Sequence, residues 1–212
     1  MAPECRNEAY QDGPIQHPVL YLSAPHMYAT IVQALELSEG MSFLNIGSGS
    51  GYLSHIVARI AGPSINHGIE QRREAVEFAM SRCAVIPEFR DLNYIRFRCG
   101  DAFAISAKGN LKYDRIYVGA GIQSSHSVVF RELLAPGGMM VAPRDGELVV
   151  ITRVSEDTFV TRVLASVKFQ PLVEPEARAL RLKGKLSLAQ PNDERIGFVS
   201  SQCISTARTV RM

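Results

Sequence analysis

The chain has 212 residues, of which 46% are hydrophobic, and its formal net charge is +2 at pH 7. These values fit one globular domain with its own core, and they give no strong basic field of the kind that marks a nucleic-acid-binding protein. No apolar run approaches the ~20 residues of a membrane span, and four isolated cysteines with five scattered histidines give no metal-ligand spacing, so we expect a cytoplasmic protein without a metal site or a membrane contact.

The first part of the chain predicts an arm followed by a helix. Residues 1–20 are polar and contain prolines, which indicates an irregular N-terminal arm. Ser23 is placed to cap a helix that carries Pro25 in its first turn. Ile31 and Leu35 then mark the buried face of that helix.

Short apolar runs and helical patterns alternate after this helix. The runs Ser42–Ile46 and Asn66–Glu70 are typical of strands, and Tyr52–Ala61 between them has helical periodicity. A second helix is expected over Arg73–Cys83, and a third strand over Tyr94–Arg98. Strands that alternate with helices predict a parallel sheet with helices on both faces.

The second half of the domain continues this pattern and ends differently. Tyr113–Val118 and Met139–Ala142 are expected to be strands, with a helix over Ser125–Leu134 between them. Glu147–Arg153 and Phe159–Phe169 alternate like an antiparallel pair. The expected fold class is therefore α/β, with a mostly parallel sheet and an antiparallel C-terminal hairpin.

Strand periodicity fades after Leu172. We expect an arm over residues 1–20, one domain over 21–173, and a loosely structured tail over 174–212. A monomer is expected.

The most informative motif follows the first strand of the sheet. Gly47, Ser48, Gly49 and Gly51 form a G-x-G-x-G turn directly before a helix. A dinucleotide fingerprint would place its third glycine at the position of Tyr52, and no lysine follows to make a phosphate-binding P-loop. The turn therefore favours a nucleoside without a bound pyrophosphate, and S-adenosylmethionine fits that description. An ordinary turn between a strand and a helix is the alternative.

Acidic and small residues at other strand ends extend the expected site. Glu70 ends the second strand, where its carboxylate can accept hydrogen bonds from ribose hydroxyls. Asp101 and the Gly119-Ala120-Gly121 segment also follow strands. Ligands of parallel sheets bind at the carboxyl ends of the strands, so these residues should line one crevice with the glycine turn. A surface glutamate and ordinary turn residues are the alternatives.

Several short motifs occur in order along residues 8–172. They are Ser-Ala-Pro-His-Met at 23–27, Asn-Ile-Gly-Ser-Gly-Ser-Gly at 45–51, Gly-Ile-Glu at 68–70, Gly-Asp at 100–101, Tyr-Asp-Arg-Ile-Tyr-Val-Gly-Ala at 113–120 and Leu-Ala-Pro-Gly-Gly at 134–138. Together they resemble the protein-L-isoaspartate (D-aspartate) O-methyltransferases. The resemblance implies the Rossmann-like class I fold of S-adenosylmethionine-dependent methyltransferases. It also implies methyl transfer to the isoaspartyl carboxylate of damaged peptides and proteins.

The resemblance also assigns roles to residues. Ser23 and His26 are expected to be catalytic, although a plain helix cap and a packing residue are their alternatives. Asp101 is expected to bind the adenine amino group, and Gly119 to allow close approach near the methyl group. The full expected cofactor-binding set is Gly47, Ser48, Gly49, Gly51, Glu70, Asp101 and Gly119.

Other stretches resemble the "domain-containing" branch of the family, in which a C-terminal extension recruits a cullin-type ubiquitin ligase. They are 20–23, 40–53 with the following 66–70, and 169–173. The chain departs from the enzymes in its short segment before Ser23, in Asn45 where an aspartate is usual, and in Arg144 beside the expected substrate. The alternative function is thus a non-catalytic S-adenosylmethionine-binding recognition module that works with ubiquitin-ligase components, and activity is expected to be weak or lost. A small-molecule methyltransferase is a third reading, against which the 23–27 motif speaks.

Overall fold

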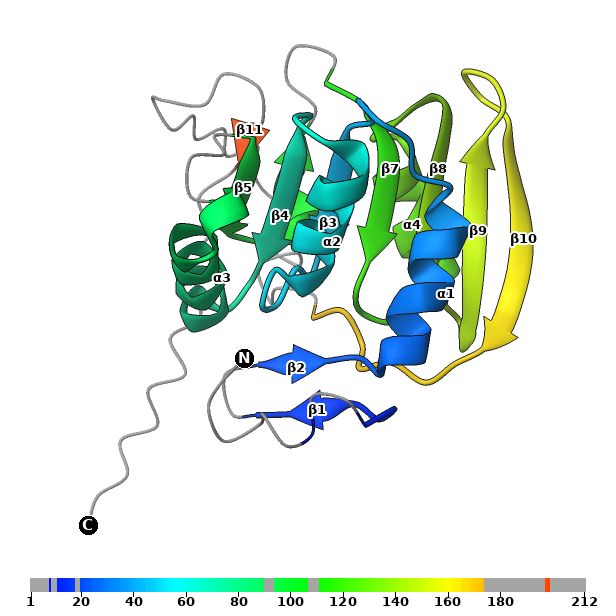
Figure 1. The fold of residues 1–212 in the computed structure, drawn as a ribbon. Helices are drawn as coiled ribbons and strands as arrows, with labels where there is room; N and C mark the ends of the chain where they lie inside the picture. The colour runs from blue at the N-terminus through cyan, green and yellow to red at the C-terminus, as the bar shows by residue number, and fades with distance from the viewer. Residues whose placement is uncertain are drawn as a thin grey trace, which may run out of the picture.

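A seven-stranded sheet forms the centre of the computed structural model, in the order β10-β9-β8-β7-β3-β4-β5 (Figure 1). The structure describes residues 8, 11–17, 20–89, 94–106, 111–173 and 197–198, so the expected tail over 174–212 lies almost entirely outside the described residues. The strands of the sheet are β3 (Phe43–Ile46), β4 (Asn66–Glu70), β5 (Ile95–Cys99), β7 (Tyr113–Val118), β8 (Leu134–Arg144), β9 (Glu147–Arg153) and β10 (Phe159–Ser166).

The pairing of these strands confirms the expected fold class. Strands β8, β7, β3, β4 and β5 pair in parallel, whereas β9 and β10 pair antiparallel at the end of the sheet. The expected helices are present as α1 (Pro25–Leu35), α2 (Tyr52–Ala61), α3 (Arg73–Val85) and α4 (Ser124–Arg131). The described part also contains four short elements that lie outside the main sheet: η2 (Pro87–Phe89), η3 (Ala102–Ala104), β6 (Ile105–Ser106) and β11 (Gly197–Phe198).

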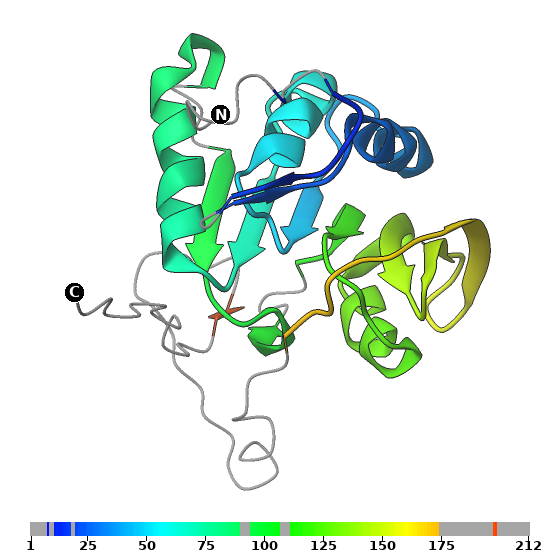
Figure 2. The same cartoon turned by 90° about the horizontal axis from the view of Figure 1, so that it is seen from below.

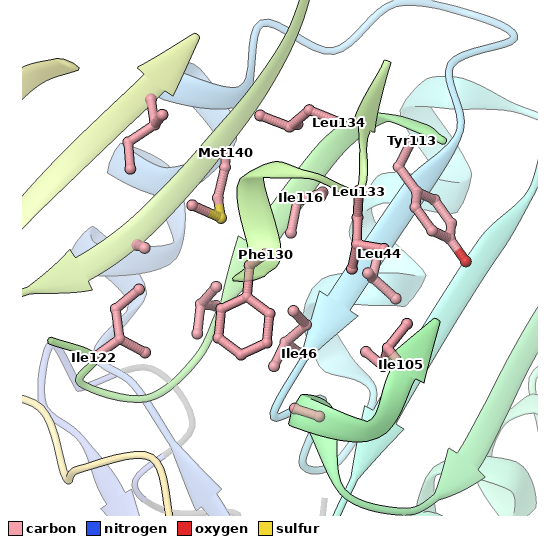
Figure 3. Close-up of a cluster of buried hydrophobic side chains, with 14 of the residues drawn as sticks. Leu44, Ile46, Ile105, Tyr113, Ile116, Ile122, Phe130, Leu133, Leu134 and Met140 are labelled. Carbon is pink, nitrogen blue, oxygen red and sulfur yellow. The ribbon is translucent and has the colours of Figure 1, made fainter. Parts of the chain in front are cut away.

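Apolar side chains cover both faces of the sheet. Helices α1 and α2 lie in front of it in Figure 1, and α4 lies behind. Figure 3 shows the cluster behind the sheet, where Phe130 of α4 packs among Ile46, Ile116 and Met140. All four of these side chains are fully buried. Burial of this kind contributes roughly 1.5–3 kcal/mol for each large apolar side chain, so the sheet is a firm base for a site at its edge.

The order of the strands reverses between β3 and β7. From β3 the chain proceeds through β4 and β5 on one side, and it then crosses to β7 on the other side. Ile46 pairs with Val118 at the carboxyl ends of β3 and β7. The turns that follow these two residues begin with Gly47 and Gly119. An open parallel sheet binds ligands at such a switch point, outside the carboxyl ends of its strands.

The N-terminal arm differs from the sequence prediction. Strands β1 (Ile15–Gln16) and β2 (Tyr21–Leu22) pair antiparallel, so part of the arm is a hairpin and not irregular. The hairpin lies below the carboxyl ends of β3 and β4, and Figure 2 shows it crossing that edge. Ile15 and Leu20 are buried, with 6% and 3% of their surface exposed. We call residues 11–24 the strap, of which 11–17 and 20–24 are described.

Candidate active site

The glycine turn is shaped by backbone bonds to the neighbouring strand. The N–H groups of Gly47 and Ser48 both donate to the Ile69 carbonyl, at 2.8 and 3.0 Å. Gly47 has φ +72° and Gly49 has φ +52°, conformations that favour glycine. A β-carbon at Gly119 would stand 2.8 Å from the Gly47 carbonyl oxygen, so only glycine lets the two turns approach this closely.

Glu70 holds the glycine turn and the next helix together. Its Oε2 accepts a hydrogen bond from the Gly49 N–H at 3.0 Å. Its Oε1 accepts from the N–H groups of Gln71 and Arg72, both at 3.0 Å, and lies 3.5 Å from the Arg72 guanidinium. Only 9% of Glu70 is exposed. A carboxylate fixed in this way still has lone pairs on Oε2 for a hydroxyl donor.

Asp101 lies beside Glu70 at the end of the next strand. The N–H of Gly100 donates to the Glu70 carbonyl at 2.9 Å, which joins the two strand ends. One carboxylate oxygen of Asp101 accepts from the Phe103 N–H at 2.9 Å and so caps η3. Asp101 is buried.

These residues line one cavity of about 300 Å³. We call residues 47–49, Glu70, Asp101 and Gly119 the cradle, and all of them except Ser48 line this cavity. The cavity is lined by Tyr21, Gly47, Gly49, Ile69, Glu70, Gln71, Arg72, Gly100, Asp101, Ala102, Gly119, Ala120 and residues 169–173. The crevice expected from the sequence therefore exists, with Gly47, Gly49, Glu70, Asp101 and Gly119 in it.

A smaller cavity of about 30 Å³ adjoins the first and shares Tyr21, Gly47, Gly49 and Gly119 with it. Asn45 Oδ1 and Ser48 Oγ are buried at this end, and neither has a hydrogen-bond partner in the part of the chain that the structure describes. The amide nitrogen of Asn45 donates to Ser54 Oγ at 3.0 Å, which turns its oxygen away from that partner. Buried oxygens without partners are costly, so this end is suited to a ligand that donates hydrogen bonds.

Together the two cavities fit S-adenosylmethionine. The cradle presents two buried carboxylates, those of Glu70 and Asp101, which can accept hydrogen bonds from a ligand. The unpartnered oxygens of Asn45 and Ser48 suit an ammonium group, which only donates. The glycine turns supply the close backbone approach that such a ligand needs.

Ser23 lies in the wall of the smaller cavity, beside Tyr28. Its N–H donates to the Tyr28 hydroxyl at 3.3 Å. Burial raises the pKa of Tyr28 to about 12, so this hydroxyl keeps its proton at neutral pH. The predicted cap is wrong, because Ala24 occupies the N-cap position of α1 and the Ser23 side chain is left outside the helix. Ser23 and Tyr28, which both carry a hydroxyl group, therefore line the same small cavity.

His26 lies outside the residues that line either cavity. Its ring is 58% exposed, and its Nδ1 lies 2.8 Å from Asp12 Oδ1. The His26 N–H donates to the same oxygen at 3.1 Å. These bonds from His26, the backbone one first, hold the pKa of Asp12 below its usual value.

Gly51 also lines neither cavity. It has φ +76° at the N-cap of α2, and a β-carbon there would meet the Phe97 ring at 2.6 Å. The geometry of Gly51 is thus explained by packing beneath the turn. A role for Gly51 in cofactor binding stays a prediction.

Sequence reasoning missed two parts of the cavity wall. The first is the strap, whose Tyr21 lines both cavities. The second is the segment after β10, which returns beneath the strands and lines the larger cavity with Phe169 and Pro171 (Figure 2). The Gly121 N–H donates to the Gln170 carbonyl, and the Leu172 N–H donates to the Gly121 carbonyl, both at 2.7 Å. The resemblance of residues 169–173 to one branch of a family was the one sequence signal there.

The described residues were also compared with the requirements of a metal site and of a membrane-spanning helix. Among the described residues, no three His, Cys, Asp or Glu side chains gather in a way that would hold a metal ion. The helices that the structure describes include none that is long and apolar enough to cross a membrane.

Comparison with known proteins identifies the family. Residues 1–177 match the family described as "Protein-L-isoaspartate(D-aspartate) O-methyltransferase (PCMT)". A protein-L-isoaspartate O-methyltransferase of Methanothrix thermoacetophila is 34% identical over 182 residues, which cover 80% of each chain. One of Ignicoccus hospitalis is 33% identical over 185 residues, which cover 82% of each chain.

Solved structures agree with this result. A putative protein-L-isoaspartate O-methyltransferase from Plasmodium falciparum, in complex with S-adenosyl-L-homocysteine, superposes with a TM-score of 0.67 and 26% identity, over 77% of this chain and 81% of that one. A second structure with the same enzyme name gives a TM-score of 0.65 at 21% identity, over 79% of this chain and 55% of that one, which supports the fold alone. The chain therefore belongs to the protein-L-isoaspartate (D-aspartate) O-methyltransferase family.

Proposed function

We propose that the protein is a protein-L-isoaspartate O-methyltransferase, which transfers a methyl group from S-adenosylmethionine to the isoaspartyl carboxylate of damaged peptides and proteins. The observation that carries this proposal is the cradle itself. A chain of this family brings the glycine turns, Glu70 and Asp101 together around one cavity of about 300 Å³ at the switch point of its sheet. That cavity is large enough for a nucleoside-sized ligand.

We assign the donor-binding roles by the chemistry of the lining residues. Glu70 accepts from the ribose hydroxyls and Asp101 from the adenine amino group. Asn45 Oδ1 and Ser48 Oγ accept from the ammonium group, which gives these two buried oxygens the partners that they need. When bound, S-adenosylmethionine supplies a methyl group on a sulfonium centre that a carboxylate oxygen can attack.

The reaction needs little acid–base chemistry from the protein. A carboxylate has a reference pKa near ~4, so the acceptor is already ionised at neutral pH. The protein has to position that carboxylate and to exclude water from it. We assign the positioning to Ser23, with the protonated Tyr28 hydroxyl beside it in the same wall. Tyr21 of the strap and residues 169–173 line the cavity, and we assign the exclusion of water to them.

His26 stays a predicted catalytic residue. Its ring bonds to Asp12 and is more than half exposed, so contact with a bound acceptor would require the ring to leave that bond. Ser23 thus lines the site, whereas His26 lies outside it.

One assay tests the proposed function. The protein is incubated with S-adenosylmethionine carrying a labelled methyl group and with two peptides of one sequence, which differ only in an isoaspartyl or an aspartyl linkage. We expect base-labile label in the isoaspartyl peptide alone, because small misplacement of a reacting group costs ~100-fold in rate. Equal labelling of both peptides, or binding of the isoaspartyl peptide without transfer, would overturn the proposal. The second result would instead support the recognition module.

We also propose a cytoplasmic, monomeric enzyme whose partners are isoaspartyl-containing proteins. The net charge of +2 gives no strong basic field. Size-exclusion chromatography with light scattering would test the monomer, and a dimer peak at micromolar concentration would contradict it.

A further inference from the structure

The start of helix α1 receives its cap from a distant residue. Pro25 has no N–H to donate, and Met27 and Tyr28 donate to the Ala24 carbonyl at 3.0 and 3.3 Å. The remaining N–H of the first turn, that of His26, donates to the Asp12 carboxylate at 3.1 Å. Asp12 thus caps the start of α1, which is the role that the sequence predicted for Ser23.

Asp12 and His26 are joined twice. The same oxygen, Asp12 Oδ1, accepts from the His26 N–H and lies 2.8 Å from His26 Nδ1. A carboxylate at a helix N-terminus also interacts favourably with the helix dipole. This pair is therefore stronger than an ordinary surface ion pair of equal exposure.

The pair closes the strap into a loop. Asp12 and His26 are 14 positions apart, and the β1–β2 hairpin lies between them. The strap is continuous with α1 at its C-terminal end, and the pair ties its N-terminal end to the same helix. A loop that is tied at both ends samples fewer conformations than one that is tied at a single end.

The tied loop lies against the donor site. Tyr21 of β2 lines both cavities. The Tyr21 carbonyl oxygen lies 3.7 Å from where a β-carbon on Gly49 would stand, so the backbone of the strap runs close to the glycine turn. Any movement of the strap away from α1 therefore opens one wall of the donor cavity.

We propose that Asp12 and His26 are positioning residues, whose paired side chains fasten the strap over the donor site and so strengthen donor binding. The proposal rests on the donor site of the proposed function. It assigns to His26 a role through Asp12 and the strap, in place of direct contact with the reacting groups.

The matched control is an exposed ion pair elsewhere on the molecule. Arg59 and Glu88 lie 2.6 Å apart, with side chains 57% and 62% exposed, against 58% and 62% for His26 and Asp12. Neither Arg59 nor Glu88 lines the two cavities. Glu88→Ala therefore removes a pair of equal exposure without touching the strap.

The test measures hydrogen exchange without ligand and affinity for S-adenosylhomocysteine by calorimetry, on the full chain. Asp12→Ala should speed exchange of the β1 and β2 amides and weaken affinity roughly three- to fivefold. Asp12→Asn should restore most of both, because its carboxamide oxygen still accepts from the His26 N–H. Glu88→Ala should change neither quantity, and the far-ultraviolet circular dichroism of all variants should match the parent.

Two results would overturn the proposal. Unchanged exchange of the hairpin amides in Asp12→Ala would show that the pair does not fasten the strap. Faster exchange with unchanged or tighter affinity would show that fastening does not serve the donor site. Exchange is read without ligand, so it decides the first question even if the protein transfers no methyl group. A parent protein that binds no S-adenosylhomocysteine would count against both the donor site and the positioning role.

Discussion

The cradle and the strap face the same cavity, but different forces hold them. The cradle is fixed by backbone hydrogen bonds at the ends of buried strands, and Glu70 within it accepts three backbone N–H groups while only 9% exposed. The strap is fixed by three buried apolar residues, Ile15, Leu20 and Ala24, and by a pair of side chains that are more than half exposed.

This difference indicates a division of labour. Buried hydrogen bonds in the cradle are not weakened by solvent, so the cradle sets which ligand binds. An exposed pair of side chains opens more readily than a buried hydrogen bond, so the strap can let a ligand enter and then cover it. Loss of a cradle residue should thus cost far more affinity than loss of the strap fastening.

The largest effect is expected from Gly119→Ala in the cradle. The added β-carbon would stand 2.8 Å from the Gly47 carbonyl oxygen, which has to move and take the glycine turn with it. S-adenosylhomocysteine affinity should fall by at least ~100-fold in calorimetry. Gly40→Ala is the control, because Gly40 also lies in a turn, with φ +83° and no atom within 4 Å of the added carbon. If the two variants bind equally well, the close approach of the turns does not shape the site.

Glu70→Ala should have the next largest effect. It removes a charge-assisted bond to a ribose hydroxyl, worth about 1.5–3 kcal/mol, or roughly 10- to 150-fold in affinity. It also removes the acceptor of the Gly49 N–H. Glu70→Gln keeps one oxygen and should retain part of the affinity. Unchanged affinity in the alanine variant, with an intact circular dichroism spectrum, would remove Glu70 from the site.

Ser23→Ala should separate methyl transfer from donor binding. Ser23 lies near the end of the strap, two residues before α1, in the wall of the smaller cavity. Loss of its hydroxyl should lower transfer to the isoaspartyl peptide roughly tenfold and leave S-adenosylhomocysteine affinity within about twofold. Equal losses in rate and in affinity would place Ser23 on the donor and not on the acceptor.

The smallest effect on the site is expected from mild acid. Mild acid should lower the stability of the folded domain through His55 before it breaks the Asp12–His26 pair. His55 is buried against Phe89, and burial first, then the charges of Arg59 and Arg82, lowers its pKa to about 4 from 6.5. The folded state therefore binds this proton less readily than the unfolded state. Its contribution to stability is fully present above pH 6.5 and is lost as the pH falls toward 4.

Urea unfolding at pH 7 and pH 5 measures this effect. The parent should lose stability between the two values, and His55→Leu should lose less. The hydrogen bonds from His26 hold the pKa of Asp12 below its ordinary value, so Asp12 stays ionised over this range and the strap stays fastened. An equal loss in parent and variant would assign the acid sensitivity to other groups.

The sequence predicted the cradle well because local patterns encode it. Strand β4, helix α2 and the G-x-G-x-G turn were expected within their observed bounds, since apolar periodicity and glycine position act over a few residues. The strap was not predicted, because its hairpin depends on contacts with the glycine turn and with α1 that are distant in sequence. The predicted cap of α1 was wrong for the same reason. Ser23 is nearer in sequence, but the tertiary fold brings Asp12 to the start of the helix.

The site residues divide in the same way. Glu70 and Asp101 end their strands and therefore meet at one edge, which the pattern of strands predicts. Gly51 belongs to the same motif as Gly47, but it packs on Phe97 and lines neither cavity. A glycine needed for packing and a glycine needed for ligand approach look alike in a sequence.

A crystal structure with bound S-adenosylhomocysteine tests the central claim most directly. We predict the ribose on Glu70 and the adenine beside Asp101. The ammonium group should lie against Asn45 Oδ1 and Ser48 Oγ, and the Asp12–His26 pair should be intact above the ligand. A ligand bound away from the cradle, or a cradle ligand with the strap displaced and the pair broken, would contradict the account.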